Sequence, residues 1–173
     1  MSIAQSLLSE FEIQAPITRR FIERLPEDKF TWKPHEKSMT AGQLAYHLAF
    51  VPTGVIRAVQ ENPKQAPDFA NFPVAKNRQE LLEVFDASVT TVRELLAKFD
   101  DAYMNETWRL VAGDREVLAQ PRGLFLRDVM LNHWYQHRGQ FSVYLRILGV
   151  PVPASWGPSA DEPPLFAQKA QAA

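Results

Sequence analysis

The chain has 173 residues, a formal net charge of -1 at pH 7 and a hydrophobic content of 46%, a combination typical of one globular domain with a sizeable core. Lysine and arginine are scattered without a basic run, which argues against nucleic-acid binding, and no apolar stretch approaches the ~18 residues of a membrane span. Cysteine is absent, which excludes disulfides, cysteine nucleophiles and thiolate metal ligands of the protein itself. Imidazole and carboxylate groups are left as candidate metal ligands.

Residues 2–25 are predicted to form the first helix, because apolar side chains recur there at three- and four-residue spacing. Ser2 and Gln5 make a capping-box pair at its start, and Pro16 predicts a kink or a short break within it. The charged residues in this segment are wrong for a signal peptide, so we expect a cytoplasmic protein.

A second helix is predicted from Thr40, which makes a capping-box pair with Gln43. Its apolar face consists of Leu44, His47, Leu48, Val51 and Val55. Pro52 lies inside this helix and lacks the N–H that would bond the Leu48 carbonyl, so a bend is expected about one turn from His47. The simplest interpretation of Pro52 is an irregularity in a long helix.

A loop with several prolines follows at 62–73, and Asn77 and Glu80 are then predicted to cap a third helix that carries apolar residues as far as Phe99. The segment 100–120 is the least helical part of the chain. It contains the turn signal Gly113-Asp114, which fits either a short hairpin or an extended loop.

The fourth helix is predicted from about Leu124 to Leu148, with Gly149 at its end. The proline-rich segment from residue 150 to 164 should wrap the surface without regular structure. These elements predict an all-α fold in a single domain, 1–173, with 150–173 as a surface tail. A four-helix bundle would bury the four apolar stripes, although the long connection between the third and fourth helices leaves a crossover topology open.

Three of the four histidines lie on predicted helices. His133 and His137 are four residues apart on the apolar stripe of the fourth helix, where side chains at i and i+4 share a face, and His47 lies on the apolar face of the second helix. Buried imidazoles are either hydrogen-bonded core residues or ligands. Because burying two unpaired imidazoles together is unfavourable, the pattern favours a metal site formed by His47, His133 and His137.

The pattern also excludes some metal chemistry. Trp134 follows His133 where a zincin motif needs glutamate, and the Glu-x-x-His pairs of a di-iron bundle are absent. A single divalent ion on three histidines remains, and imidazole suits Zn²⁺, Ni²⁺ and Fe²⁺. His35 lies in a polar loop and is interpreted as a surface residue. Arg138 and Gln140 either orient ligands or have solvated or capping roles, and Gly139 suggests close helix packing.

Several runs of the sequence resemble the DinB/YfiT-like family. They are Leu25-Pro26, Trp32-Lys33-Pro34, the run from Ala41 to Leu48, the run His133-Trp134-Tyr135-Gln136-His137-Arg138-Gly139-Gln140, the run Gly149-Val150-Pro151-Val152-Pro153 and the run Trp156-Gly157-Pro158-Ser159. The runs occur in the family's order and span most of the chain, while residues 62–120 add little.

The resemblance implies an up-down-down-up four-helix bundle, often a homodimer, with a divalent metal ion, commonly nickel or zinc, on His47, His133 and His137. It also implies an S-transferase-like activity with a low-molecular-weight thiol such as bacillithiol, mycothiol or glutathione. A metal-dependent hydrolase and a metal-binding stress or interaction protein without turnover are the alternatives. The resemblance assigns no catalytic acid or base.

Overall fold

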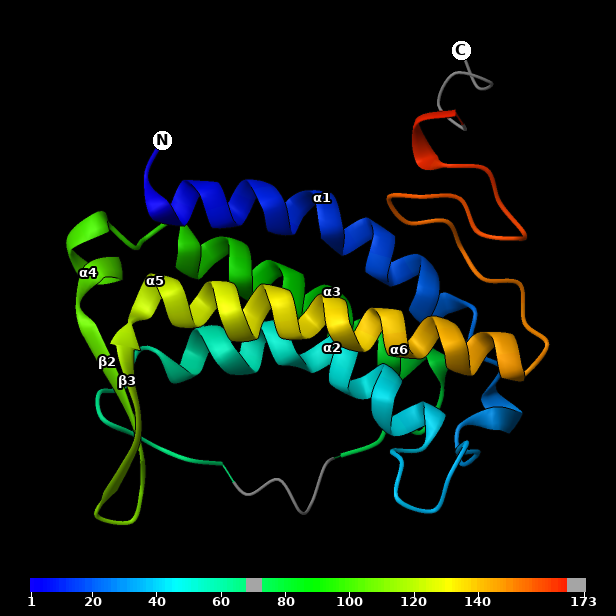
Figure 1. Cartoon of the computed structure of the whole chain (residues 1–173), viewed down its shortest axis with the longest axis horizontal. Helices are drawn as coiled ribbons and strands as arrows, with labels where there is room; N and C mark the ends of the chain where they lie inside the picture. Colours follow the sequence, from blue (N-terminus) through cyan, green and yellow to red (C-terminus); the bar gives the residue numbers. More distant parts are fainter. Residues whose placement is uncertain (68–72, 168–173) are drawn as a thin grey trace.

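Figure 1 shows the computed structural model, which describes residues 1–67 and 73–167. Residues 68–72 of the loop predicted at 62–73, and residues 168–173 of the predicted tail, lie outside the described residues. The long helices are α1 (Ile3–Glu23), α2 (Ala41–Ala58), α3 (Arg78–Leu96) and α6 (His133–Ile147). The shorter helical elements are η1 (Glu27–Lys29), α4 (Asp101–Asn105), α5 (Arg122–Phe125) and the π-helical segment η2 (Leu126–Asn132).

Three of the long helices, α1, α2 and α3, begin at the capping residues that the sequence predicts. The side chains of Ser2, Thr40 and Asn77 each accept a hydrogen bond from a backbone N–H in the first turn of α1, α2 and α3. Pro16 does not break α1, which continues without interruption to Glu23, although Figure 1 shows its axis bending in the second half. α5, η2 and α6 follow one another directly, so they form one continuous helical segment in place of the single predicted α-helix.

The helices lie side by side along the long axis of the molecule. α1 and α6 run in one direction, and α2 and α3 run in the opposite one (Figure 1). Their facing sides form a shared apolar core that includes Phe11, Leu44, Leu81 and Phe141. Within the part of the chain that the structure describes, no helix has the length and apolar character needed to cross a bilayer.

The long connection between α3 and α6 contains a hairpin, so the prediction of an all-α fold is wrong in this region. β2 (Thr107–Ala112) pairs antiparallel with β3 (Arg115–Pro121), and β1 (Lys64–Gln65) joins β2 in parallel. Ala112 pairs with Arg115, so the predicted turn residues Gly113 and Asp114 form a two-residue loop. Gly113 has φ of +60°, which glycine adopts readily and which tight hairpin turns require.

The proline-rich tail is held on the ends of α1 and α6 by arginine–carboxylate pairs. Glu162 contacts Arg20 of α1 and Arg24, which directly follows α1, and Asp161 contacts Arg146 of α6. The turn into the tail is a Schellman motif, in which Gly149 has φ of +71° and the N–H of Val150 donates to the Leu145 carbonyl. Residues 150–164 contain no helix or strand, as the sequence predicts.

A buried tryptophan connects α6 to the irregular part of α2. Trp134 is 1% exposed, and its indole N–H donates to the Leu48 carbonyl at 2.8 Å. That carbonyl is the one that Pro52, four residues further along α2, cannot bond. The interpretation of Pro52 as plain irregularity is therefore incomplete, because the carbonyl that it frees forms a hydrogen bond between two helices.

We predict that Trp134→Phe lowers the free energy of unfolding by about 1–3 kcal/mol beyond the effect of lost volume, because the buried Leu48 carbonyl loses its donor. In a Pro52→Ala background the alanine N–H supplies a donor to the same carbonyl, so the effect of Trp134→Phe should be smaller there. Urea denaturation of the four proteins in this double-mutant cycle measures the difference. Equal effects of Trp134→Phe in both backgrounds would contradict the role assigned to the hydrogen bond.

Candidate metal centre

His47 is presented by the middle of α2. The helix begins at the Thr40 cap, whose side chain accepts from the Gln43 N–H while the Gln43 side chain accepts from the Thr40 N–H. Leu44 and Leu48, on either side of His47 along the helix face, are fully buried and anchor that face in the core. His47 itself is 8% exposed, so its imidazole lies at the border between the core and the surface.

His133 and His137 occupy the first turn of α6, directly after the π-helical segment. The N–H of His133 donates to the carbonyl of Asp128, five residues earlier. A π-helical turn takes in one residue more than an α-helical turn, so it changes which residues beyond it face the core. Trp134 and Arg138 are the buried residues of these turns, while His133 and His137 are only half-buried. The sequence predicts that the two histidines point inward, but the structure places them at the edge of the buried face.

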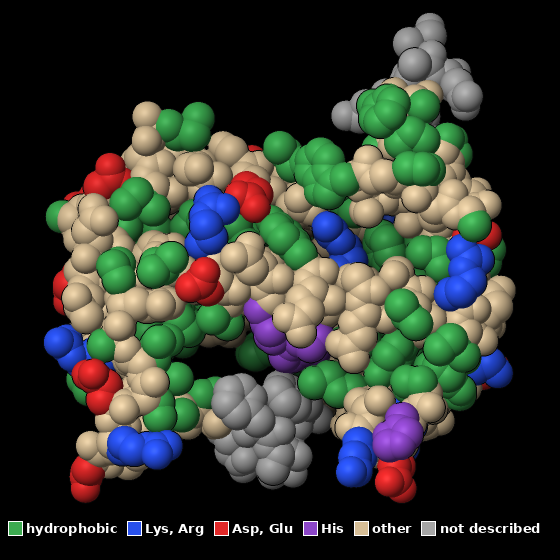
Figure 2. Space-filling view, viewed as in Figure 1, with side chains coloured by type: hydrophobic (Ala, Val, Ile, Leu, Met, Phe, Trp, Pro, Cys, Tyr) green, Lys and Arg blue, Asp and Glu red, His purple; other side chains and the backbone are tan. Residues whose placement is uncertain are grey.

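The three predicted ligands converge on one point. The Nε2 atoms of His133 and His137 are 2.8 Å apart, and one candidate ligand atom from each of His47, His133 and His137 lies within 4.8 Å of the other two. The His47 ring centroid is 5.2 Å from that of His133 and 4.6 Å from that of His137, with the rings nearly perpendicular in both pairs. Figure 2 shows purple histidine side chains that reach the surface in the middle of this face.

This donor set fits a divalent metal ion. Metal–imidazole bonds of about 2.0–2.1 Å put two nitrogens on one ion no more than about 4 Å apart, so small side-chain rotations bring all three within range. Among the residues that the structure describes, this is the one group of three or more His, Cys, Asp or Glu side chains with suitable spacing. Three protein ligands without a fourth are typical of sites that keep a coordination position for water or substrate.

Gln140 supports His137 from the same helix. Its Oε1 lies 2.9 Å from Nδ1 of His137. If Nδ1 carries the proton and donates it to this oxygen, Nε2 presents its lone pair to the other two histidines, which is the tautomer that an Nε2 ligand requires. The sequence left open whether Gln140 orients a metal ligand or has a solvated or capping role. Its contact with His137 favours the orienting role.

The electrostatics keep two of the imidazoles neutral. Burial lowers the pKa of His47 to about 4, and the neighbouring His137 and His133 act in the same direction. Burial also lowers the pKa of His133, as does His137, while an interaction with the Val129 backbone opposes the shift. Because only the neutral imidazole has a lone pair for a metal, both shifts favour metal binding at neutral pH.

The other residues considered from the sequence lie outside this group. His35 is exposed, and its Nδ1 accepts a hydrogen bond from the Lys37 N–H. Tyr46 and Tyr135, the chain neighbours of the histidines, have contacts elsewhere, since Tyr46 stacks on Phe50 and Tyr135 donates a hydrogen bond to Glu10. The expectation that Gly139 allows close helix packing is wrong, because an added Cβ would meet no atom within 4 Å.

Comparison with known proteins agrees with this geometry. The sequence profile of the DinB family matches residues 1–165. The chain belongs to the DinB family. A curated relative, the uncharacterized protein YrdA of Bacillus subtilis (strain 168), is 25% identical over 156 residues, which cover 90% of this chain and 89% of YrdA.

Crystal structures of DinB family proteins have a similar fold. A DinB-like protein from Bacillus cereus ATCC 10987 matches with a TM-score of 0.68 and 19% identity, over 87% of this chain and 96% of that one. The DinB-like protein YjoA of Bacillus subtilis matches with a TM-score of 0.63 and 22% identity, over 83% and 92% of the two chains. At these identities the comparison supports the fold alone.

We predict that this DinB family protein binds about one divalent ion per chain, and that His47→Ala and His137→Ala each abolish the binding, because two imidazoles hold an ion far more weakly than three. His35→Ala is the matched control and should keep the full stoichiometry. Elemental analysis of untagged protein after reconstitution with Zn²⁺, Ni²⁺ or Fe²⁺ measures this. Metal retained in His47→Ala, or absent from the unmodified protein, would mean that the histidines are not a metal site.

We also predict that Gln140→Ala lowers metal affinity roughly 10–100-fold, the usual effect of removing a hydrogen-bond partner of a metal-binding histidine. Gln136→Ala is the control, because Gln136 is an exposed glutamine on the same helix. Competition with a chromogenic chelator gives both affinities. Equal affinities in the two variants would remove Gln140 from the site.

Proposed function

We propose that this protein binds one divalent metal ion through His47, His133 and His137 and acts as a metal-dependent S-transferase that uses a low-molecular-weight thiol. The observation that carries the proposal is the set of three imidazoles within 4.8 Å of one another, with no fourth His, Cys, Asp or Glu ligand among the described residues. Two of the three, His133 and His137, are only half-buried. A site of this kind can admit an exogenous ligand, whereas a purely structural metal site is normally closed by four protein ligands.

The donor set limits the choice of metal. Neutral imidazole suits Ni²⁺, Zn²⁺ and Fe²⁺, and hard oxygen-preferring ions such as Mg²⁺ and Ca²⁺ are disfavoured without carboxylate ligands. We propose nickel or zinc, with iron as the third candidate.

The nucleophile has to come from outside the chain, since the protein has no cysteine. A bound divalent ion lowers the pKa of a coordinated thiol and so supplies thiolate at neutral pH. In the net reaction the thiol sulfur forms a bond to an electrophilic carbon, the leaving group departs with its bonding electrons, and the thiol proton passes to water.

The residues of the chain prepare the site for this chemistry. Burial keeps His47 and His133 neutral, and Gln140 orients His137. The hydrogen bond from Trp134 to Leu48 joins the neighbours of His133 and His47, so it holds the two helices that present the ligands at a constant separation. A preorganised site of this kind avoids the ordering that metal or substrate binding would otherwise require.

Two alternatives use the same ligands. A metal-dependent hydrolase would use water in the open position and would benefit from a general base. No Asp or Glu of the described residues belongs to the cluster, which favours the thiol reaction. In a metal-binding stress or interaction protein without turnover, the ion would mainly connect α2 to α6.

We predict that the reconstituted protein accelerates the consumption of bacillithiol, mycothiol or glutathione by iodoacetamide at pH 7. A free thiol with a pKa of about 8.5 is only a few per cent ionised at this pH, so complete ionisation raises the thiolate concentration roughly 30-fold. Loss of free thiol, followed with and without metal, measures the effect. His47→Ala should abolish it and His35→Ala should not.

The outcomes separate the alternatives. Full metal loading without metal-dependent consumption of any of the three thiols would contradict the transferase proposal and favour the role without turnover. Metal-dependent hydrolysis of a nitrophenyl ester in the absence of thiol would favour the hydrolase.

Several further expectations stay predictions. We infer that α1, α2, α3 and the α5–η2–α6 segment form a single-domain four-helix bundle of up-down-down-up order, which the helix directions in Figure 1 support. The homodimeric state and the cytoplasmic location expected from the sequence are proposed on the family resemblance and on the charge pattern of the first helix. We expect neither nucleic acid nor a membrane as a partner.

A further inference from the structure

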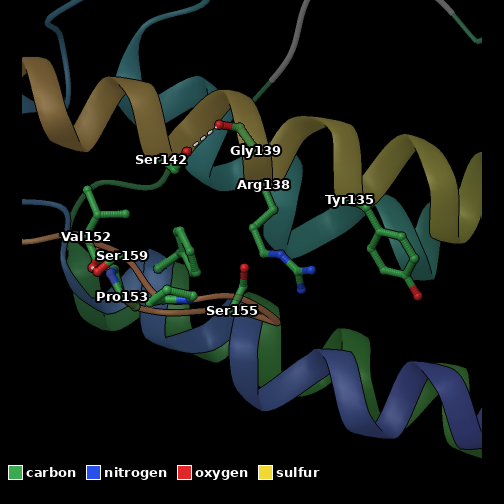
Figure 3. Close-up of a pocket in the computed structure, with 10 residues that line it drawn as sticks. Tyr135, Arg138, Gly139, Ser142, Val152, Pro153, Ser155 and Ser159 are labelled. Carbon is green, nitrogen blue, oxygen red and sulfur yellow. Dashed lines mark hydrogen bonds between the residues drawn. The ribbon is translucent and has the colours of Figure 1, made fainter. Parts of the chain in front are cut away.

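A cavity lies where α1, α6 and the proline-rich tail meet, apart from the three histidines. It has a volume of about 280 Å³, and its lining includes Phe21 from α1, Arg138 from α6 and Val152, Pro153 and Ser155 from the tail. Figure 3 shows the Arg138 side chain reaching from α6, and the Ser155 hydroxyl reaching from the tail, into the same space. α6 thus contributes side chains both to the histidine cluster and to this cavity. His137 faces His47 of α2, whereas the next residue, Arg138, contacts Thr18 of α1.

Arg138 is a buried cation without a countercharge. It is only 7% exposed, and among the described residues it donates one hydrogen bond, to Thr18 Oγ1 at 3.2 Å. Its remaining polar contact is with the ring of Tyr135, whose centroid is 5.3 Å from the guanidinium carbon. No Asp or Glu of residues 1–67 and 73–167 forms an ion pair with it, and the two tail carboxylates that come near α6 and α1 are paired with other arginines.

This arrangement is unfavourable without an anion. A guanidinium stays protonated at any physiological pH, and removing it from water is penalised unless an opposite charge and hydrogen bonds compensate. Arginine has five N–H donors in a planar fork, and a carboxylate can accept two of them side by side. Arg138 uses one donor within the protein, so donors remain for an anion in the cavity.

The rest of the lining indicates what kind of anion fits. Ser155 Oγ makes no hydrogen bond to the described residues, so its O–H is available to a ligand, whereas Ser142 and Ser159 donate theirs to backbone carbonyls. Phe21, Val152 and Pro153 provide an apolar wall. One positive charge matches a monoanion, and the volume lies just below the usual range of about 300–1,000 Å³ for ligand pockets, which requires a small molecule.

We propose that this cavity is a binding site for a small organic carboxylate, whose carboxylate is held by Arg138 and Ser155 and whose apolar part lies against Phe21, Val152 and Pro153. The site is separate from the three histidines and does not depend on the metal-dependent activity proposed above.

The proposal is tested by calorimetric titration of the metal-free, full-length protein with sodium benzoate. Benzamide, which has the same shape without the charge, and inorganic phosphate are the comparison probes. Benzoate should bind at least about tenfold more tightly than either, and Arg138→Met should weaken benzoate binding by a similar factor, as expected for the loss of a charge-assisted hydrogen bond. Ser155→Ala should weaken it about fivefold, the effect of one neutral hydrogen bond.

Two control variants locate the binding. Arg115→Met removes an exposed arginine at the hairpin and makes the same change in net charge, so benzoate affinity should be unchanged. His47→Ala should also leave it unchanged, which distinguishes this cavity from carboxylate binding to residual metal. If Arg138→Met fails to fold, as judged by circular dichroism, the benzamide comparison and Ser155→Ala still decide the question.

The proposal is overturned if benzoate gives no binding heat, if benzamide or phosphate binds as tightly as benzoate, or if Arg115→Met weakens benzoate binding as much as Arg138→Met. Loss of benzoate binding in His47→Ala would overturn it as well, because the carboxylate would then be binding at the histidines.

Discussion

The hydrogen bond between the Trp134 indole and the Leu48 carbonyl connects the two helices on which the candidate metal centre depends. Each partner is the chain neighbour of a histidine, His133 on α6 and His47 on α2. The acceptor lacks its usual helical donor because Pro52 has no N–H, and the Trp134 indole donates to it instead. A fully buried carbonyl with one suitable donor tolerates little sliding of α6 along α2, and this constrains the separation of the three imidazoles.

The π-helical segment before α6 has a complementary effect. It shifts the buried face so that Trp134 and Arg138 point into the protein, while His133 and His137 move to the edge of that face. Histidines in the middle of the core would be inaccessible to an exogenous ligand, and histidines on the open surface would be fully solvated and easily protonated. The intermediate position lowers the pKa of His133 by burial and still leaves His133 and His137 partly exposed.

α6 therefore carries two different kinds of polar side chain on two sides, one facing α2 and the other facing α1 and the tail. Toward α2 it offers neutral nitrogen ligands, and toward α1 and the tail it offers a buried guanidinium beside a small cavity. The tail completes this second side, because its arginine–carboxylate pairs hold Val152, Pro153 and Ser155 over the ends of α1 and α6. Gly139, which lines the cavity and is not closely packed, belongs to this side of the helix as well.

The sequence by itself determined the starts of α1, α2 and α3, the turn at Gly113-Asp114 and the three candidate ligands, because caps, turns and helical spacing are local properties of neighbouring residues. It left open whether the turn belongs to a hairpin or to an extended loop. It also indicated the orphaned Leu48 carbonyl, but it could not say which donor would reach it. The tertiary structure alone decided that Trp134 is this donor, that a π-helical segment shifts His133 and His137, and that Arg138 is buried without a countercharge. The contacts of Trp134 with Leu48 and of Arg138 with Thr18 join residues 86 and 120 positions apart. Such contacts depend on how the helices pack, and local sequence patterns carry no information about that packing.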